Sequence, residues 1–467
     1  MLFSSQSLCS ADPRPSAKIR GKALPAFLRA LCASAVIASP AFAQDLAKRP
    51  PAQEMPIAIV HATIHPIAGD EIKDGYIQFD KGKIVEIGSM EGGRMFAATI
   101  RQIDAKGKHV YPGLISPITQ LGLEEIASVR ASNDFNEAGN ITPEVTPAVS
   151  VNPDSTLLPV TRTNGVLIAG IFPKGGVLPG RVSVIQLDGW TSEDMTIKRD
   201  CGQLIAWPLT RTVRAPWMDR SDEDQQRDIR QSLDRIRDAF RSAKAYIDLK
   251  AAEPTTPTDL RWEAMRDVLA GKLPVFIEAQ DFDQITASLM FAQEFKLRPV
   301  IVGGRDAPLC AELLKKLDAP VIVTGTYRVT PRRDDSGYDE QFSLPARLKA
   351  AGIRFAIASG EETPHERNLP YSAALAAAHG LTPAEALRAI TLDAATILGI
   401  DSRVGSLEKG KDATIIITDG DPLEVSTVVS QAFIQGRAID LGNKQSALAE
   451  KYREKYRQQP KNEPRTK

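Results

Sequence analysis

Between Tyr111 and Ile400 the sequence alternates short, nearly continuous apolar runs with longer amphipathic stretches. Apolar runs of this kind are typical of parallel β-strands that are buried on both faces. Strands that alternate with helices predict a parallel sheet, and seven or eight such repeats predict an α/β fold closed into a (β/α)8 barrel of the TIM type. The candidate strands are Tyr111–Ile118, Val166–Phe172, Gln203–Trp207, Pro274–Ala279, Pro299–Gly303, Pro320–Gly325 and Arg354–Ser359.

Helices between these strands are predicted from the spacing of apolar residues. In Asp224–Ile247 the side chains of Ile229, Leu233, Ile236 and Phe240 share one helical face, and Arg and Asp residues fill the other. The same kind of pattern predicts helices over Asp281–Phe295, Ala307–Leu317 and Ala384–Leu398.

Two segments depart from the alternation. Leu121–Asn152 is a long polar stretch without a clear helix, and Val177–Ile197 has the pattern of an inserted β-hairpin that turns around Pro179-Gly180-Arg181. Long loops in compact domains are more often functional or capping elements than idle connections. We therefore expect both segments to shape the surroundings of a site.

Both ends of the chain carry β-type patterns. Ile57–Ile67, Gly75–Phe79 and Ile84–Ile87 precede the barrel, with a hairpin turn before Ile84. Gly410–Ile417 and Val428–Leu441 follow it. A barrel flanked by strands on both sides predicts that the two ends pair into one small satellite sheet. The charged segment beyond Lys444 is expected to form a frayed helix and a tail.

The first 43 residues have the pattern of a secretory signal peptide. A basic region around Arg14–Arg29 precedes the short apolar run Ala30–Ile37, and Ala41-Phe42-Ala43 fits the small-residue cleavage rule. A transit peptide for an organelle is the alternative, because such peptides are also basic and serine-rich. The apolar run and the cleavage site favour export to the periplasm or the medium.

Composition excludes several classes of partner. The 58 Lys and Arg residues balance 58 Asp and Glu residues, whereas nucleic acids and anionic membranes require a basic face. No run after the leader approaches the roughly 18 apolar residues of a membrane span. Only Cys201 and Cys310 lie beyond the cleavage site, too few for a disulfide scaffold. We expect both cysteines to be buried thiols, and the alternative is a disulfide between Cys201 and Cys310.

Several motifs resemble a metal-dependent amidohydrolase of the imidazolonepropionase-like kind. They are Asp104–Ile115 at the entrance of the barrel, and Gly380–Leu387, Thr391–Ile400 and Gly405–Ala413 at its end. The resemblance covers roughly Ile57–Leu441 and implies a (β/α) barrel with a composite β-sandwich built from both chain ends. The implied organisation is a signal peptide (1–43), a linker (44–54), the first part of the sandwich (55–108), the barrel (109–402), the second part of the sandwich (403–442) and a charged tail (443–467).

The resemblance implies hydrolysis of carbon–nitrogen bonds other than peptide bonds, with one or two divalent metals, zinc, manganese or iron. A metal ion of this kind makes hydroxide available at neutral pH. Ile118 and Gln120 occupy the positions of the family's His-x-His pair, and Glu278 and Gly303 occupy the next two ligand positions. Ile cannot bind a metal, and the neutral amide of Gln is a poor ligand for a transition metal.

The family's last-strand aspartate falls near Ala358–Glu361, where Glu361 or Glu362 would have to substitute. Only five histidines are present in the whole chain. His61, His65, His109 and His379 are expected to be structural or on the surface, and His365 alone follows a barrel strand. One imidazole cannot build the three- or four-ligand site that activates water on zinc.

Other uses of these residues remain open. Glu278 would serve as a general base if burial raised its pKa, or would pair with an arginine at the barrel mouth. Glu278, Glu361, Glu362 and His365 together would offer mainly oxygen atoms to a weakly bound hard cation. We assign no catalytic residue and no metal ligand, and the candidate residues at the barrel mouth are Gln120, Glu278, Glu361, Glu362 and His365.

The sequence therefore predicts an exported amidohydrolase-like protein that does not run binuclear metal hydrolysis, and that acts in binding, as a scaffold or as a pseudoenzyme. The alternative is an active amidohydrolase on a cyclic amide, a dipeptide or a similar substrate, with a rebuilt mononuclear or metal-free site. A small amide-like ligand, a catalytic homologue and a second copy of the chain are all compatible partners.

Overall fold

A computed structural model of the chain describes residues 49–329, 336–360 and 362–459. The predicted signal peptide, residues 1–43, lies outside this part of the chain, as do Glu361 and the end of the predicted tail. In the described residues, no helix is both long enough and apolar enough to cross a membrane.

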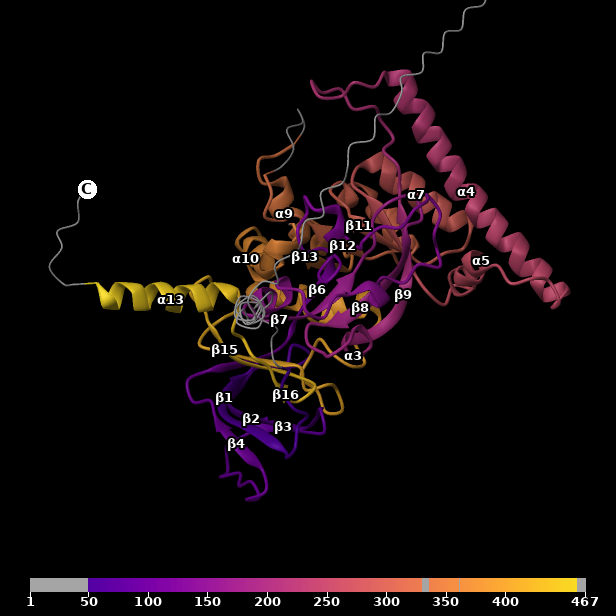
Figure 1. Cartoon of the computed structure of the whole chain (residues 1–467). Helices are drawn as coiled ribbons and strands as arrows, with labels where there is room; N and C mark the ends of the chain where they lie inside the picture. Colours follow the sequence, from indigo (N-terminus) through magenta and orange to yellow (C-terminus); the bar gives the residue numbers. More distant parts are fainter. Residues whose placement is uncertain (1–48, 330–335, 361, 460–467) are drawn as a thin grey trace, which may run out of the picture. The chain divides into compact units, whose positions relative to one another are not determined.

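The larger sheet has eight strands whose spatial order follows the sequence. The first strand, β6, also lies against the last, β13, so that the sheet is a nearly closed barrel (Figure 1). Its strands are β6 (Leu114–Thr119), β7 (Val166–Ile171), β8 (Gly180–Gln186), β9 (Thr196–Ala206), β10 (Val275–Ala279), β11 (Pro299–Gly303), β12 (Val321–Thr324) and β13 (Phe355–Ala358). The mixed α/β fold and the barrel are thus confirmed.

The barrel is not a uniform series of β/α repeats, and this corrects the (β/α)8 prediction. Strand β8 runs antiparallel to both of its neighbours, β7 and β9. The expected inserted hairpin at Val177–Ile197 is in fact part of the barrel wall. Only residues 172–179 connect β7 to β8. A parallel return needs a crossover of a dozen or more residues, so a connection this short fixes the antiparallel direction.

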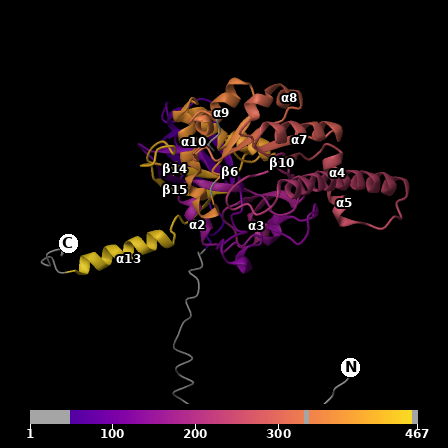
Figure 2. The same cartoon turned by 90° about the horizontal axis from the view of Figure 1, so that it is seen from above.

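Helices cover the outside of the barrel where the apolar spacing predicted them. In α4 (Asp222–Ala252), Ile236 and Phe240 are buried. Ser221 caps the first turn of α4 by accepting a hydrogen bond from the Asp224 backbone N–H. Figure 2 shows α5 (Leu260–Ala264) beside α4. The predicted helix at Ala384–Leu398 is two helices, because Thr391 has a non-helical backbone.

The other helical segments are all shorter than α4. They are η1 (Arg130–Ser132), η2 (Pro147–Ser150), α2 (Leu157–Arg162), α3 (Ser192–Met195), α6 (Arg266–Leu269), α7 (Phe282–Glu294), η3 (Ala307–Cys310), α8 (Ala311–Lys316), α9 (Glu340–Ala350), η4 (Thr363–Asn368), α10 (Leu369–Ala378), α11 (Pro383–Ala389), α12 (Leu392–Leu398) and α13 (Lys444–Gln458). No residue of α13 is buried.

The smaller sheet joins the two ends of the chain, as the sequence predicted. Its order is β16-β15-β14-β5-β1-β2-β3, with β4 paired to β1. The antiparallel pair of β5 and β14 makes the connection between the two ends. The strands are β1 (Ile57–Ile64), β2 (Ile72–Asp80), β3 (Lys83–Ser89), β4 (Arg101–Asp104), β5 (His109–Pro112), β14 (Ile415–Thr418), β15 (Val429–Ile434) and β16 (Arg437–Ala438).

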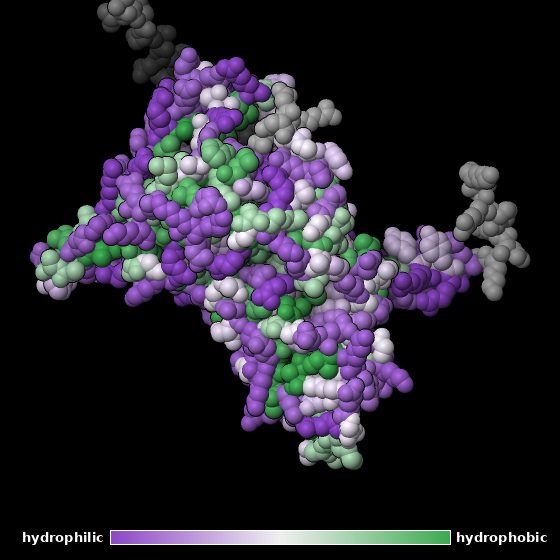
Figure 3. Space-filling view, turned by 180° about the vertical axis from the view of Figure 1, so that it is seen from behind, coloured by the Kyte–Doolittle hydropathy of each residue, from purple (hydrophilic) through white to green (hydrophobic). Residues whose placement is uncertain are grey.

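The hydropathy of the surface and the burial of the two cysteines agree with what the composition predicts. Seen from behind, hydrophilic residues cover most of the molecular face, and apolar residues gather only in small patches, one of them over the smaller sheet (Figure 3). Such a face is ordinary for a folded protein in water. Cys201 and Cys310 are both free and buried, so the expectation of buried thiols is confirmed.

The chain passes from the smaller sheet to the barrel at Gly113. The predicted strand Tyr111–Ile118 is therefore two strands, β5 in the smaller sheet and β6 in the barrel. A Cβ atom on Gly113 would lie 2.9 Å from Leu167 Cδ1 and 3.0 Å from Thr414 Cγ2. The backbone of this transition fits between the two packed layers only because glycine has no side chain.

We expect Gly113→Ala to lower the free energy of unfolding by about 1–3 kcal/mol, the usual cost of overpacking a buried site. Urea denaturation of the purified protein measures this change. Gly69→Ala is the matched control, because nothing lies within 4 Å of a Cβ atom there. Equal stability of the two variants would contradict the tight packing at Gly113.

Candidate functional site

The mouth of the barrel, at the carboxyl ends of the parallel strands, is where barrel enzymes carry their chemistry. The long loop Leu121–Asn152 follows β6 and covers this end. The Lys174 backbone N–H, after β7, donates to the Phe135 carbonyl oxygen at 2.7 Å. On the other side, the Thr363 hydroxyl donates to Glu124 Oε2 at 2.6 Å. The loop thus connects the segments that follow β7 and β13.

Ile118 lies in a bulge of β6. The pairing of β6 with β7 shifts register between Ser116 and Thr119. The bulge brings the Pro117 carbonyl oxygen so close to Gly170 that a Cβ atom there would be 2.4 Å away. Ile118 itself is half-buried and packs against the barrel core. At this position the side chain contributes to packing and offers nothing to a metal or a proton.

Gln120 is half-buried at the end of β6. Its Nε2 donates to the carbonyl oxygen of Phe172, the residue after β7, at 3.2 Å. The amide therefore helps to hold together the carboxyl ends of two neighbouring strands. This use leaves the Gln120 amide nitrogen engaged with the backbone.

Glu278 is the residue of the mouth whose environment most changes its chemistry. It lies near the end of β10, paired in register with Val302 of β11 and Ala206 of β9. Burial raises the pKa of the Glu278 carboxyl, and the positive charge of Lys174 partly opposes this rise. A carboxyl in such surroundings holds its proton at higher pH than a solvated one.

Gly303 ends β11 with a φ of +103°, in the region that favours glycine. A Cβ atom there would lie 2.2 Å from Gln280 Nε2. A side chain at this position would therefore require the Gln280 side chain to move and the backbone to accept strain. Both requirements disfavour a ligand-bearing residue at position 303.

The remaining candidates lie in and before the 3-10 helix η4. Glu361 is outside the described residues, and Glu362 and His365 are both exposed. A 3-10 helix repeats every three residues, so Glu362 and His365 share its outer face. The His365 backbone N–H donates to the Glu362 carbonyl oxygen at 2.8 Å, but in the described part of the chain no hydrogen bond or ion pair joins the side chains of Glu278, Glu362 and His365. The structure therefore does not bring these three candidates together.

The same three-residue period places Glu366 on the inner face, and sequence reasoning missed this residue. Glu366 is 1% exposed. Its Oε1 accepts a hydrogen bond from the Ser116 hydroxyl of β6 at 2.6 Å. Its Oε2 accepts one from the Ser359 hydroxyl, just after β13, at 2.9 Å. The three-residue period of η4 is the signal that could have identified Glu366, because it places Glu366 on the same buried face as Thr363.

A metal centre of the family type does not fit these side chains. The four positions that the resemblance assigns to ligands hold a packed Ile118, an amide engaged with the backbone in Gln120, a single carboxyl in Glu278 and a crowded Gly303. Among the residues that the structure describes, no group of three or more His, Cys, Asp or Glu side chains is placed to hold a metal ion. We therefore derive no catalytic step through a metal.

Residues 324–439 match the amidohydrolase family. The matched residues run from the end of β12 through β16. The amidohydrolase tasK of Hapsidospora irregularis is 23% identical to this chain over 375 residues, which are 72% of this chain and 37% of that protein. This chain thus spans well under half the length of that curated relative.

Solved structures agree on the fold. An amidohydrolase from Thermotoga maritima MSB8 superimposes with a TM-score of 0.71, at 24% identity, over 82% of this chain and 99% of that one. A Xaa-Pro dipeptidase with bound methionine has a TM-score of 0.52, at 12% identity, over 82% and 100% of the two chains. A prolidase complexed with N-methylphosphonate-L-proline has a TM-score of 0.51, at 15% identity, over 82% and 99%. The predicted resemblance is confirmed at the level of the amidohydrolase superfamily.

We expect Glu366→Gln to lower the free energy of unfolding by about 1–3 kcal/mol, because a buried acceptor of two hydroxyl hydrogen bonds is replaced by an amide with a single acceptor. Glu362→Gln on the exposed face of the same helix is the matched control and should change little. Urea denaturation of both variants measures the difference. Equal stabilities would mean that the two serine contacts contribute nothing to the fold.

The raised pKa of Glu278 predicts a specific pH dependence of stability. In the unfolded chain the carboxyl loses its proton near its ordinary pKa, whereas in the folded chain burial retains the proton. The contribution of Glu278 to the free energy of unfolding therefore falls as pH rises from the pKa of its carboxyl in the unfolded chain toward its pKa in the folded chain. We expect Glu278→Gln to match the original protein near pH 4 and to melt at a higher temperature near neutral pH.

Calorimetry at several pH values tests this expectation, with exposed Glu91→Gln as the control. A melting-temperature difference for Glu278→Gln that stays constant between acid and neutral pH would contradict the effect of burial on the Glu278 carboxyl.

Proposed function

We propose that this protein is an exported member of the amidohydrolase superfamily that binds a small amide-like ligand at the barrel mouth and does not run the family's metal-dependent hydrolysis. The observation that carries the proposal is the set of side chains at the mouth. Ile118 supplies packing, Gln120 a contact to the backbone, and Gly303 a tight turn that favours glycine. None of these three supplies a nitrogen or anionic oxygen ligand for a metal ion.

Amide-like chemistry in the ligand is supported by Glu278. Burial raises the pKa of the Glu278 carboxyl and so extends the pH range in which it is protonated, and a protonated carboxyl donates a hydrogen bond to a carbonyl oxygen, whereas a carboxylate only accepts. Two structures with the same fold, a prolidase and a Xaa-Pro dipeptidase, carry names that refer to peptide substrates. We extend that chemistry to this chain as a binding preference for small amides or dipeptides.

Export is supported by the amino-terminal pattern alone, in which the apolar run Ala30–Ile37 precedes Ala41-Phe42-Ala43. The mature chain would then begin at Gln44. The two buried free thiols, Cys201 and Cys310, are compatible with an oxidising compartment, because neither is exposed to reagents there.

The test is metal analysis of the mature protein, purified after expression with its leader and without a metal-affinity step. We expect a mature amino terminus at Gln44 by mass spectrometry and far less than one metal ion per chain by plasma mass spectrometry. Chelator treatment should leave the melting temperature unchanged, because no metal contributes to the fold. Stoichiometric zinc, manganese or iron would overturn the proposal.

One observation favours a second function, an active hydrolase with a rebuilt site. The Glu278 carboxyl has the raised pKa that suits a general acid or base. A screen of amides, lactams and dipeptides, with and without added divalent metals, distinguishes the two functions. If the protein turns over one of these substrates, and if Glu278→Gln abolishes this turnover while His365→Ala leaves it intact, the function is catalysis and not binding alone. Background rates throughout would eliminate the hydrolase.

A further inference from the structure

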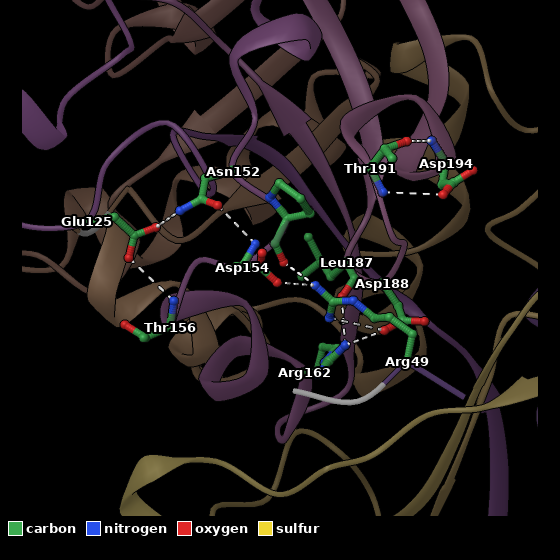
Figure 4. Close-up of polar contacts among 11 residues, drawn as sticks. Arg49, Glu125, Asn152, Asp154, Thr156, Arg162, Leu187, Asp188, Thr191 and Asp194 are labelled. Carbon is green, nitrogen blue, oxygen red and sulfur yellow. Dashed lines mark hydrogen bonds and ion pairs between the residues drawn. The ribbon is translucent and has the colours of Figure 1, made fainter. Parts of the chain in front are cut away.

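A single buried carboxylate, that of Asp188, gathers three guanidinium groups from distant parts of the chain. Arg162 Nη1, at the end of α2, lies 2.8 Å from Asp188 Oδ1, and Arg49 Nη1 lies 3.6 Å from the same oxygen. Arg437 Nη2, in β16, lies 3.4 Å from Asp188 Oδ2. Figure 4 shows Arg49 and Arg162 converging on Asp188. Arg49 falls within the predicted linker 44–54 and is here packed against the barrel.

The buried part of this cluster has an excess of positive charge. Arg162 and Asp188 are each 2% exposed, and the Arg49 side chain is 5% exposed. Asp154, at 3.3 Å from Arg49, and Asp440 are also nearby acids, but both are exposed to water. Water screens exposed charges far more than buried ones. Among the buried side chains, where water screens little, the guanidinium groups of Arg49 and Arg162 therefore outnumber the single carboxylate of Asp188.

A cavity of about 510 Å³ lies beside the cluster. Arg49 and Arg437 line it together with Gln186, Gln435, Asp194 and the exposed Trp190. The cavity is far from the barrel mouth: Gln186 ends the antiparallel strand β8 and pairs with Ile168, near the start of β7. It therefore lies at the amino-terminal edge of the parallel strands, opposite the mouth.

Two polar groups at this cavity have unused hydrogen-bonding capacity. Gln186 is 3% exposed, and its Nε2 donates to the Asp194 carbonyl oxygen at 2.9 Å, but its Oε1 has no partner among the described residues. The Arg437 guanidinium, within the same described part, contacts Asp188 as an ion pair and makes no hydrogen bond. A buried acceptor without a donor is costly, and such groups normally find a partner.

We propose that this cavity is a binding site for a small carboxylate with an N–H group next to it, as in an N-acylated amino acid or a peptide carboxyl terminus. Arg437 binds the carboxylate through paired N–H donors, the geometry in which guanidinium and carboxylate match. Gln186 Oε1 accepts the hydrogen bond from the ligand N–H. The Trp190 ring covers the apolar part of the ligand.

The acidic side chain at the cavity is compatible with this arrangement. Asp194 directs its carboxylate back to its own helix end, where Oδ2 accepts from the Thr191 backbone N–H at 3.2 Å (Figure 4). This contact belongs to the capping box of α3. The Asp194 carboxylate is thus engaged within its own helix end, and the backbone carbonyl oxygen of Asp194 orients the Gln186 side chain.

The test uses N-acetylglycine as the probe on the full mature protein, by calorimetric titration and by the fluorescence of Trp190. We expect saturable binding, with a dissociation constant in the range of about 0.1–10 mM for so small a ligand. N-acetylglycinamide lacks the carboxylate and acetate lacks the N–H group, so both should bind much more weakly. The Trp190→Phe variant should lose most of the fluorescence change.

Two variants locate the site. Arg437→Gln and Gln186→Met should each weaken binding by about tenfold or more, since each removes one contact to the ligand. Arg241→Gln, on the exposed face of α4, is the control for nonspecific attraction of anions. Should Arg437→Gln fail to fold, Gln186→Met alone decides. No saturable binding to the original protein, or binding that neither variant weakens, overturns the proposal.

Discussion

The hydrogen bonds between the Glu366 carboxylate and the hydroxyls of Ser116 and Ser359 are the interaction on which the barrel depends. Strand β6 and strand β13 lie next to each other without pairing into the continuous ladder, so this seam needs another connection. Glu366 supplies it at a buried position. The same 3-10 helix contacts the loop over the mouth through Thr363 and Glu124. Closure of the barrel and coverage of its mouth thus share one short helix.

The contacts that hold the barrel together are made by protein side chains. The barrel core is a continuous apolar cluster, and the seam is held by protein side chains. Neither needs a cation at the mouth. Ile118 contributes packing to that core, whereas a histidine would add a polar group that requires its own partners. Under the proposed function, the barrel would keep its stability without a metal ion at its mouth.

Much of the fold follows from the sequence, because strands buried on both faces produce apolar runs that local pattern can detect. Strand β8 was mistaken for part of an inserted hairpin, since its direction depends on the short connection before it. The break at Gly113 depends on two layers that no local pattern contains. His365 was a candidate from its position after a strand, but the period of η4 turns it outward and turns Glu366 inward. The cluster around Asp188 joins residues from as far apart in the sequence as Arg49 and Arg437, which periodicity cannot reveal.

The pairing of β5 with β14 has a consequence for how the chain is made. Residues 109–112 and 415–418 become neighbours only after some three hundred intervening residues exist. Until then the growing chain presents the apolar edge of β5, with Val110 and Tyr111, to any strand that meets it. Pairings this distant in sequence also form slowly. The finished structure covers this edge of β5 with β14, so its exposure belongs to synthesis and folding alone.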